Sequence, residues 1–100
     1  MTLVVTGAMP HANGTVEISE SAANRARMSF NPSANPAVDR IKTLAAALYS
    51  ECELIQAQAK KRSEEAGTIG SDATAGREAA TAMTHIQAGA MFAVSAATAA

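Results

Sequence analysis

The C-terminal stretch from Arg77 to Ala100 constrains the fold more than any other part of the chain. After Glu78 it contains no Asp, Glu, Lys or Arg, and its Ala, Met, Ile, Phe and Val residues are spread around the whole circumference of a helix. A helix that is apolar on all sides is normally buried on several of them. A single further helix cannot surround it, so we expect the chain to associate with copies of itself.

The apolar residues of the chain are mainly alanine. Hydrophobic residues make up 48% of the sequence, whereas aromatic residues make up 3% and tryptophan is absent. Alanine is the strongest helix former, and its small side chain lets helices approach closely. A chain of 100 residues forms at most one domain with a modest core. We therefore expect a mainly α-helical protein that gains stability by oligomerising.

A first long helix is predicted between Asn35 and Gly67. Asn35 is a suitable N-cap, Pro36 suits the first helical position, where a missing N–H costs nothing, and Gly67 can end the helix. Apolar residues alternate three and four positions apart along this helix and form a seam for a second helix. The seam consists of Val38, Ile41, Ala45, Leu48, Cys52, Ile55 and Ala59. The charged residues 60–65 beyond it are expected to be exposed.

A second helix completes an antiparallel helical hairpin. Residues 66–76 are small, polar and rich in glycine, so they are predicted to form the turn, and the helix is expected to begin between Asp72 and Gly76. Because this helix stays apolar outside the contact with the first helix, its other faces are predicted to meet further protomers. Its seam consists of Ala79, Met83, Ile86, Ala90, Ala93 and Ala97.

Residues 1–29 are predicted to form a short β-hairpin and a connector. The segments 2–6 and 15–19 are rich in Val, Ile and Thr, and His11-Ala12-Asn13-Gly14 between them supplies a turn. A lone hairpin is marginal in water, so it must pack on the helices or pair with another copy. Residues 21–28 are expected to be a polar connector with about one helical turn. Residues 30–100 then form the helical-hairpin domain, through which the chain oligomerises.

Charge and composition exclude several function classes. The formal net charge of −1 predicts no bulk attraction to a nucleic acid polymer or to an anionic membrane. The uncharged C-terminal run has about the length of a membrane span, but His85, Gln87 and Gly89 interrupt it and make insertion unfavourable. No signal peptide opens the chain, and its single cysteine cannot form an internal disulfide. These features predict a cytoplasmic location.

Few side chains are suited to catalysis or metal binding. Cys52 lies in the predicted seam, where a cysteine is more often a small buried hydrophobe than a thiolate. His11 and His85 belong to no HExxH or CxxC motif and have no partners at metal-ligand spacing. The glycine-bearing segment 67–77 lacks the GK[ST] ending of a P-loop. We therefore predict no enzyme activity, no cofactor and no metal.

Anion binding is plausible at two places, of which the first is the start of the first helix. Its free N–H groups favour phosphate, and Phe30, with Asn31 beside it, precedes the helix and can stack on a base. Lys42 projects from the second turn, and Tyr49 follows seven residues later on the same side. The alternative is that Phe30 anchors the chain as a hydrophobic staple and Lys42 is a solvated flank of the seam.

The second candidate site lies on the C-terminal helix. Arg77, Thr81, Thr84 and His85 recur at three- and four-residue spacing, so they share one face. The alternative interpretation of this group is a polar helix face with a capping arginine.

Two segments carry a resemblance to a known family. Residues 30–45 (FNPSANPAVDRIKTLA) and 76–94 (GREAATAMTHIQAGAMFAV) resemble the phage anti-CBASS protein 2 family, and the helical hairpin is also similar to that of an anti-Thoeris sponge family. The resemblance extends over roughly residues 30–98. Its most specific part is the REA-x-x-A-hydrophobic-T-H pattern that begins at Arg77.

The resemblance implies a phage protein that is located in the cytoplasm of the infected bacterial host. It also implies that the protein performs no chemistry. Members bind the cyclic oligonucleotide signals of antiviral immunity, keep them from their effectors and assemble as compact, typically hexameric, helical oligomers. Cyclic dinucleotides lie between paired protomers, with an aromatic residue on a base and a lysine on phosphate, for which Phe30 and Lys42 are the candidates. Cyclic trinucleotides occupy a separate pocket built by several protomers around an Arg and a Thr one turn apart, which Arg77 and Thr81 match.

An alternative from another class remains open. A phage structural or assembly module could use the same helical hairpin only to oligomerise or to dock a partner helix. A hydrolase of the same ligands is a more remote third possibility.

Overall fold

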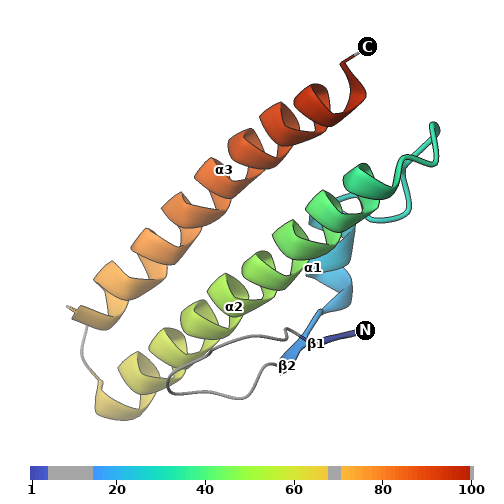
Figure 1. The fold of residues 1–100 in the computed structure, drawn as a ribbon. Coiled ribbons are helices and arrows are strands. Elements are labelled where there is room, and N and C mark those ends of the chain that lie inside the picture. The colour runs from blue at the N-terminus through green and yellow to red at the C-terminus, as the bar shows by residue number, and fades with distance from the viewer. Residues whose placement is uncertain (5–14, 68–70, 100) are drawn as a thin grey trace.

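The fold is an antiparallel pair of long helices with a small N-terminal unit packed beside it. The computed structural model describes residues 1–4, 15–67 and 71–99. Helix α2 (Pro36–Ala66) and helix α3 (Ser71–Thr98) run side by side in opposite directions (Figure 1). Strands β1 (Thr2–Val4) and β2 (Thr15–Glu17) and the short helix α1 (Glu20–Arg25) precede them. The prediction of a mainly helical hairpin with an N-terminal β-hairpin is confirmed.

The ends of α2 are those that its capping residues predict. The Asn35 side-chain oxygen accepts a hydrogen bond from the Ala37 N–H at 2.9 Å, and Pro36 occupies the first turn. At the other end Gly67 adopts a left-handed conformation, with φ of 62°, and its N–H donates to the Ser63 carbonyl. Glycine adopts this conformation without a Cβ penalty, so it ends the helix at low cost.

Helix α3 begins earlier than predicted. It starts at Ser71, so residues 71–76 are helical and the expected turn over residues 66–76 is too long. The Gln56 side chain of α2 donates to the Gly76 carbonyl at 3.3 Å, and Ala75 and Gly76 are partly buried. Packing on α2 thus outweighs the cost of about 1 kcal/mol for a glycine inside a helix.

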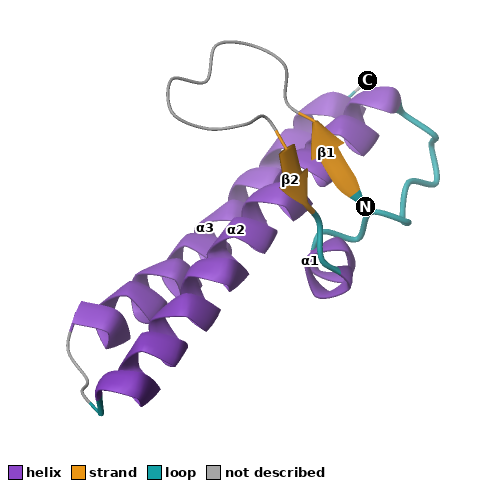
Figure 2. Cartoon of the chain, turned by 90° about the horizontal axis from the view of Figure 1, so that it is seen from below, coloured by secondary structure: helices purple, strands orange, loops and turns teal. Residues whose placement is uncertain are grey.

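The N-terminal strands pair in antiparallel fashion, with Leu3 opposite Val16 (Figure 2). The turn predicted at His11–Gly14 lies outside the described residues. The second strand ends at Glu17, before the predicted end at Ser19, because Ile18 enters the core and Ser19 becomes the N-cap of α1. Since Ile18 is buried with residues of α2 and α3, the hairpin packs on the helices, which was one of its two expected alternatives.

Helix α1 is fastened to the middle of α2 by a group of hydrogen bonds. The Ser19 N–H donates to the Ser50 hydroxyl at 3.0 Å. The carboxylate of Glu53 accepts bonds from the Ser19 hydroxyl at 2.9 Å and from the Ser21 hydroxyl at 2.8 Å. These bonds hold the start of α1 against the flank of α2 that does not face α3.

The core lies where α1, α2 and α3 meet. Four seam residues of α2 are buried as predicted, namely Val38, Ala45, Cys52 and Ala59. The seam residues Leu48 and Ile55, however, are 50% and 43% exposed. Helix α2 buries one flank against α3 and a second against α1 and β2, so its third flank, which carries these two side chains, is left uncovered.

In their place, α2 buries side chains outside the seam. Tyr49 is 1% exposed, and Ala46, Ala47 and Ser50 are also buried. On α3, Ala79 and Met83 are buried, and the four remaining seam residues are partly buried, namely Ile86, Ala90, Ala93 and Ala97. None of the helices in the described part of the chain combines the length and hydropathy needed to cross a bilayer.

Candidate ligand-binding groove

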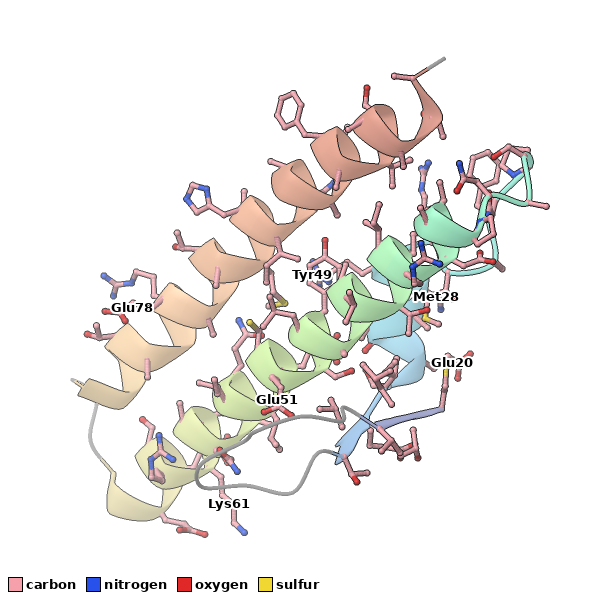
Figure 3. The ribbon with its side chains drawn as sticks, in the orientation of Figure 1. Glu20, Met28, Tyr49, Glu51, Lys61 and Glu78 are labelled. Carbon is pink, nitrogen blue, oxygen red and sulfur yellow. The ribbon has the colours of Figure 1, made fainter. Side chains whose placement is uncertain are left out.

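A groove of about 500 Å³ lies between α3 and the segment that joins α1 to α2. This volume falls within the range of small-molecule sites. Three separate parts of the chain line the groove. Figure 3 shows that Tyr49, one of the lining residues, lies between the two long helices. The lining comprises Arg25, Ala26, Arg27 and Phe30 before α2, Lys42 and Tyr49 on α2, and Gln87, Ala90, Met91, Val94 and Ser95 on α3.

The wall before α2 is a tight turn that follows α1. Arg27 adopts a left-handed conformation with φ of 54°, and its N–H donates to the Asn24 carbonyl at 3.1 Å. The Phe30 N–H donates to the Arg27 carbonyl at 3.0 Å. A left-handed conformation is rare for a residue with a side chain, and it persists where neighbouring contacts hold it. The turn therefore places Arg27 and Phe30 together at the groove.

Phe30 and Lys42 lie against each other at the edge of the groove. The Lys42 ammonium is 5.1 Å from the centre of the Phe30 ring and donates a hydrogen bond to the Phe30 carbonyl. The Phe30 residue is 59% exposed, so its ring does not act as the buried staple of the alternative interpretation. Lys42 is partly buried and has a partner, so it is more than a solvated flank.

Tyr49 contributes to both the core and the groove. The Arg25 guanidinium lies 5.6 Å from the centre of the Tyr49 ring, within the range of a cation–π contact. Burial raises the pKa of Tyr49 above its ordinary value of 10.0, and the positive charge of Arg25 opposes that rise. The phenol is therefore neutral at physiological pH.

The groove is strongly cationic for a chain with a formal net charge of −1. Its lining includes the positive side chains Arg25, Arg27 and Lys42, and no Asp or Glu. Like charges gathered around one hollow produce a local positive potential that attracts anions. Locally placed cations, rather than the overall charge, thus make the groove suitable for an anionic ligand.

Asn31, predicted as a site residue beside Phe30, lies outside the groove lining. Its amide group donates to the Asn35 carbonyl at 2.9 Å and to the Asp39 carboxylate at 2.8 Å. The first turn of α2 is likewise absent from the lining, and Asn35 already caps it. Asn31 therefore shapes the turn that leads into α2.

The second predicted group, Arg77, Thr81, Thr84 and His85, lies on an exposed face of α3 away from the groove. The Thr81 hydroxyl donates to the Arg77 carbonyl at 3.0 Å, and the Thr84 hydroxyl donates to the Ala80 carbonyl at 3.3 Å. The four side chains share one face, as their spacing predicts. All four side chains are exposed on the described protomer.

Several groove residues were not identified from sequence patterns. Arg25 and Arg27 appeared there only as part of a polar connector, although two arginines shortly before Phe30 are a local excess in a chain with only eight Lys and Arg residues. Gln87 and Met91 are four positions apart on α3 and so share a face. Only the packing of α3 against α2 brings that face to Tyr49.

The described residues offer few groups suited to metal binding or acid–base chemistry. Within the described ranges, no group of three His, Cys, Asp or Glu side chains could hold a metal ion. Burial raises the pKa of the Cys52 thiol, and the nearby charge of Glu51 adds to the rise, so the thiol is neutral and inaccessible. The groove lining itself contains no His, Cys, Asp or Glu that could serve as a general base.

The fold defines a small helical-hairpin protein with a cationic groove beside its long helices. Residues 20–98 match the family described as Acb2/Tad1, hairpin domain, and the chain belongs to this family. The resemblance inferred from residues 30–98 is thereby confirmed, and the match extends it to the start of α1. Membership of this family implies a sponge-like phage protein. No curated protein and no solved structure matches the chain.

Proposed function

We propose that the protein is a phage immune-evasion sponge that binds cyclic oligonucleotide second messengers and sequesters them without cleaving them. The observation that carries the proposal is the cationic groove beside an exposed aromatic ring, in a chain of the Acb2/Tad1 hairpin family. A cyclic oligonucleotide combines phosphates with flat bases, and the groove offers a partner for each. The site of action is the cytoplasm of the infected bacterial host.

In the groove, the exposed ring of Phe30 stacks on a base of a cyclic dinucleotide, and the Lys42 ammonium contacts a phosphate. Stacking on an aromatic side chain is worth about 1–3 kcal/mol per base. A cyclic dinucleotide is close to two-fold symmetric, so two protomers facing each other present one ring and one lysine to each half. Tyr49 forms the base of the groove, and Asn31 maintains the turn that carries Phe30.

A second pocket is proposed for cyclic trinucleotides at the exposed group on α3. Three copies of Arg77 around a three-fold junction match the three phosphates, because arginine binds phosphate through paired hydrogen bonds. Thr81, one helical turn away, supplies a hydroxyl, and Thr84 and His85 extend the same face. The exposure of all four side chains is compatible with a site completed by neighbouring protomers.

The proposed assembly is a homo-oligomer, most simply a hexamer, formed through residues 30–100. The apolar surface that remains exposed on the long helices of one protomer supports this assembly. Phe92 and Met91 on α3 are 78% and 66% exposed, and Leu44, Leu48 and Ile55 are exposed on α2. Residues 1–29 are the proposed N-terminal unit, whose Ile18 and Ala22 share the core with α2 and α3.

Native mass spectrometry with a panel of cyclic di- and trinucleotides tests the proposal. We expect the oligomer to retain whole ligands in a fixed ratio, and heat or protease treatment to release them intact. Lys42→Ala should weaken dinucleotide binding and Arg77→Ala trinucleotide binding, whereas Lys61→Ala, at the exposed charged end of α2, should change neither. Recovery of linear products only would indicate a hydrolase.

A second candidate function is a phage assembly module without a ligand. The highly exposed Phe92 favours it, because self-association alone would explain that surface. An oligomer that binds no member of the nucleotide panel would support this alternative over the sponge.

A further inference from the structure

We infer that Arg25 and Arg27 are phosphate-binding residues of the groove, so that the ligand is held between the N-terminal segment and the helical hairpin. The inference rests on the proposed function and deepens it. Besides the ligand contacts of Phe30 and Lys42, it adds contacts from a second wall of the groove. It also assigns a role to α1 and the turn after it, which lie within the region matched by the family but hold none of the site residues proposed above.

The position of Arg25 leaves its hydrogen-bond donors available. Its guanidinium lies over the buried ring of Tyr49, at 5.6 Å from the ring centre. A guanidinium in a cation–π contact can still donate its N–H groups to a phosphate in a bidentate contact. Arg25 forms no salt bridge with any carboxylate in the described part of the chain.

Arg27 is presented by the strained turn that also carries Phe30. Its left-handed backbone, at φ of 54°, is joined to Phe30 by the hydrogen bond between the Phe30 N–H and the Arg27 carbonyl. Its side chain is exposed and, like that of Arg25, has no carboxylate partner among the described residues. The turn therefore places Arg27 and Phe30 in the lining of the same groove.

The number of cations predicts which ligands the groove prefers. Each protomer contributes three positive side chains, Arg25, Arg27 and Lys42, so each half of a two-fold site can meet one phosphate of a cyclic dinucleotide with several donors. A cyclic mononucleotide carries one phosphate and would leave most of this positive charge unpaired. The groove should therefore favour cyclic oligonucleotides over cyclic mononucleotides, with electrostatic attraction that weakens as salt is raised.

Glu53 acts as a positioning residue for the groove wall that carries Arg25 and Arg27. Its carboxylate accepts the hydroxyl groups of Ser19 and Ser21 at the start of α1, at 2.9 Å and 2.8 Å. It is not part of the groove lining, so it has no direct contact with a ligand there. Loss of these bonds would release the helix that carries Arg25 and leads into Arg27.

The test measures binding by calorimetry for cyclic di-AMP, cyclic di-GMP, cyclic GMP-AMP and, as the one-phosphate probe, 3′,5′-cyclic AMP. For the tightest dinucleotide, Arg25→Ala and Arg27→Ala should each weaken binding about ten-fold or more, since hydrogen bonds to charged groups are lost. The affinity should also become less sensitive to salt. Arg40→Ala, an exposed arginine outside the groove, is the matched control and should retain full affinity.

Arg25→Lys and a double-mutant cycle distinguish direct contact from structural support. Arg25→Lys keeps the charge but not the planar donor pair, so it should show an intermediate loss of affinity with the salt dependence preserved. Glu53→Ala should weaken binding in the wild type but cost nothing further in the Arg25→Ala/Arg27→Ala background. If the loss of affinity caused by Glu53→Ala simply adds to the loss caused by the two arginine substitutions, the positioning role of Glu53 is contradicted.

The outcomes separate this inference from the proposed function. If the wild type binds none of the nucleotides, the assignment of this groove to dinucleotides is wrong. The assignment of Arg25 and Arg27 as phosphate-binding residues is then wrong as well. If the wild type binds and Lys42→Ala weakens binding while Arg25→Ala and Arg27→Ala do not, only the inference is overturned. Equal affinity for cyclic AMP and the dinucleotides would contradict the charge argument.

Discussion

Tyr49 joins the core of the protein to its groove. It is the largest fully buried side chain among the described residues, and it is also the single tyrosine of a chain without tryptophan. Its absorbance and fluorescence therefore report on one position only. Because Arg25 lies over the ring, Tyr49 provides a direct probe of whether α1 is in place.

At the residue scale, we predict that Arg25→Ala raises the pKa of Tyr49 further. Burial already raises this pKa above 10.0, and the positive charge of Arg25 counteracts part of the rise. Removing the charge removes the opposing effect. Ultraviolet titration of the tyrosinate band measures the change, with helical circular dichroism followed in parallel to confirm that the chain stays folded.

The sign of the pH dependence follows from the same shift. Tyrosine in the unfolded chain ionises near 10.0, whereas buried Tyr49 ionises at higher pH. Stability is therefore fully present below pH 10.0 and falls as the pH rises through the pKa of the folded state, because the unfolded state loses its proton first. Arg40→Ala should leave the titration unchanged, and a lower pKa in Arg25→Ala would contradict the contact.

At the scale of elements, the start of α2 is tied to the end of α3 through one side chain. The Asn35 oxygen caps the Ala37 N–H at 2.9 Å, and its amide nitrogen donates to the Ala97 carbonyl at 3.2 Å. An N-cap residue thus also joins the open end of the hairpin. The same residue fixes where α2 begins and helps hold α3 beside it.

We predict that Asn35→Ala lowers the free energy of unfolding by about 1–2 kcal/mol. The change removes both the cap and the bond to α3. Urea denaturation monitored by circular dichroism measures the loss. Ser33→Ala, an exposed residue in the same turn, should alter the free energy by no more than about 0.5 kcal/mol. A loss no larger than that of Ser33→Ala would show that the cap does not limit stability.

At the scale of the whole molecule, the unevenly covered surface of α2 becomes important. The N-terminal unit protects one flank and α3 a second, while Leu44, Leu48 and Ile55 remain exposed on the third. Monomeric proteins rarely leave a long apolar surface uncovered. The proposed oligomer buries this flank together with the exposed side chains of α3.

We therefore predict that Leu48→Glu and Phe92→Ser each reduce the mass of the particle in solution. A charge placed on the α2 flank, or the loss of the most exposed aromatic ring of α3, should weaken contacts between protomers. Light scattering coupled to size-exclusion chromatography measures the mass, and circular dichroism checks the helix content.

Gln58→Ala, an exposed change further along α2, is the control and should leave the mass unchanged. A wild type that is monomeric at micromolar concentration would rule out the assembly. If one of the two variants keeps the wild-type mass, the helix flank that carries the substituted residue is not part of the interface.

Local chemistry determined where helix α2 begins and ends. Asn35, Pro36 and Gly67 act through the backbone groups within a turn of themselves, so their effect could be predicted without knowledge of the rest of the fold. Phe30, Lys42 and Tyr49 could be grouped for the same reason, because they lie near one another on a single stretch of chain. The family resemblance likewise depended on residues in sequence order.

Only the tertiary structure decided which flank of each helix is buried. Alanine is spread over every face of the long helices, so several packings satisfy the same pattern. The hydrogen bonds that the Ser19 and Ser21 hydroxyls donate to Glu53 accompany the packing in which Tyr49 is buried and Leu48 is exposed. The groove depends on that choice, because Arg25 and Met91 are far apart in the chain and meet only when α1 and α3 pack around α2.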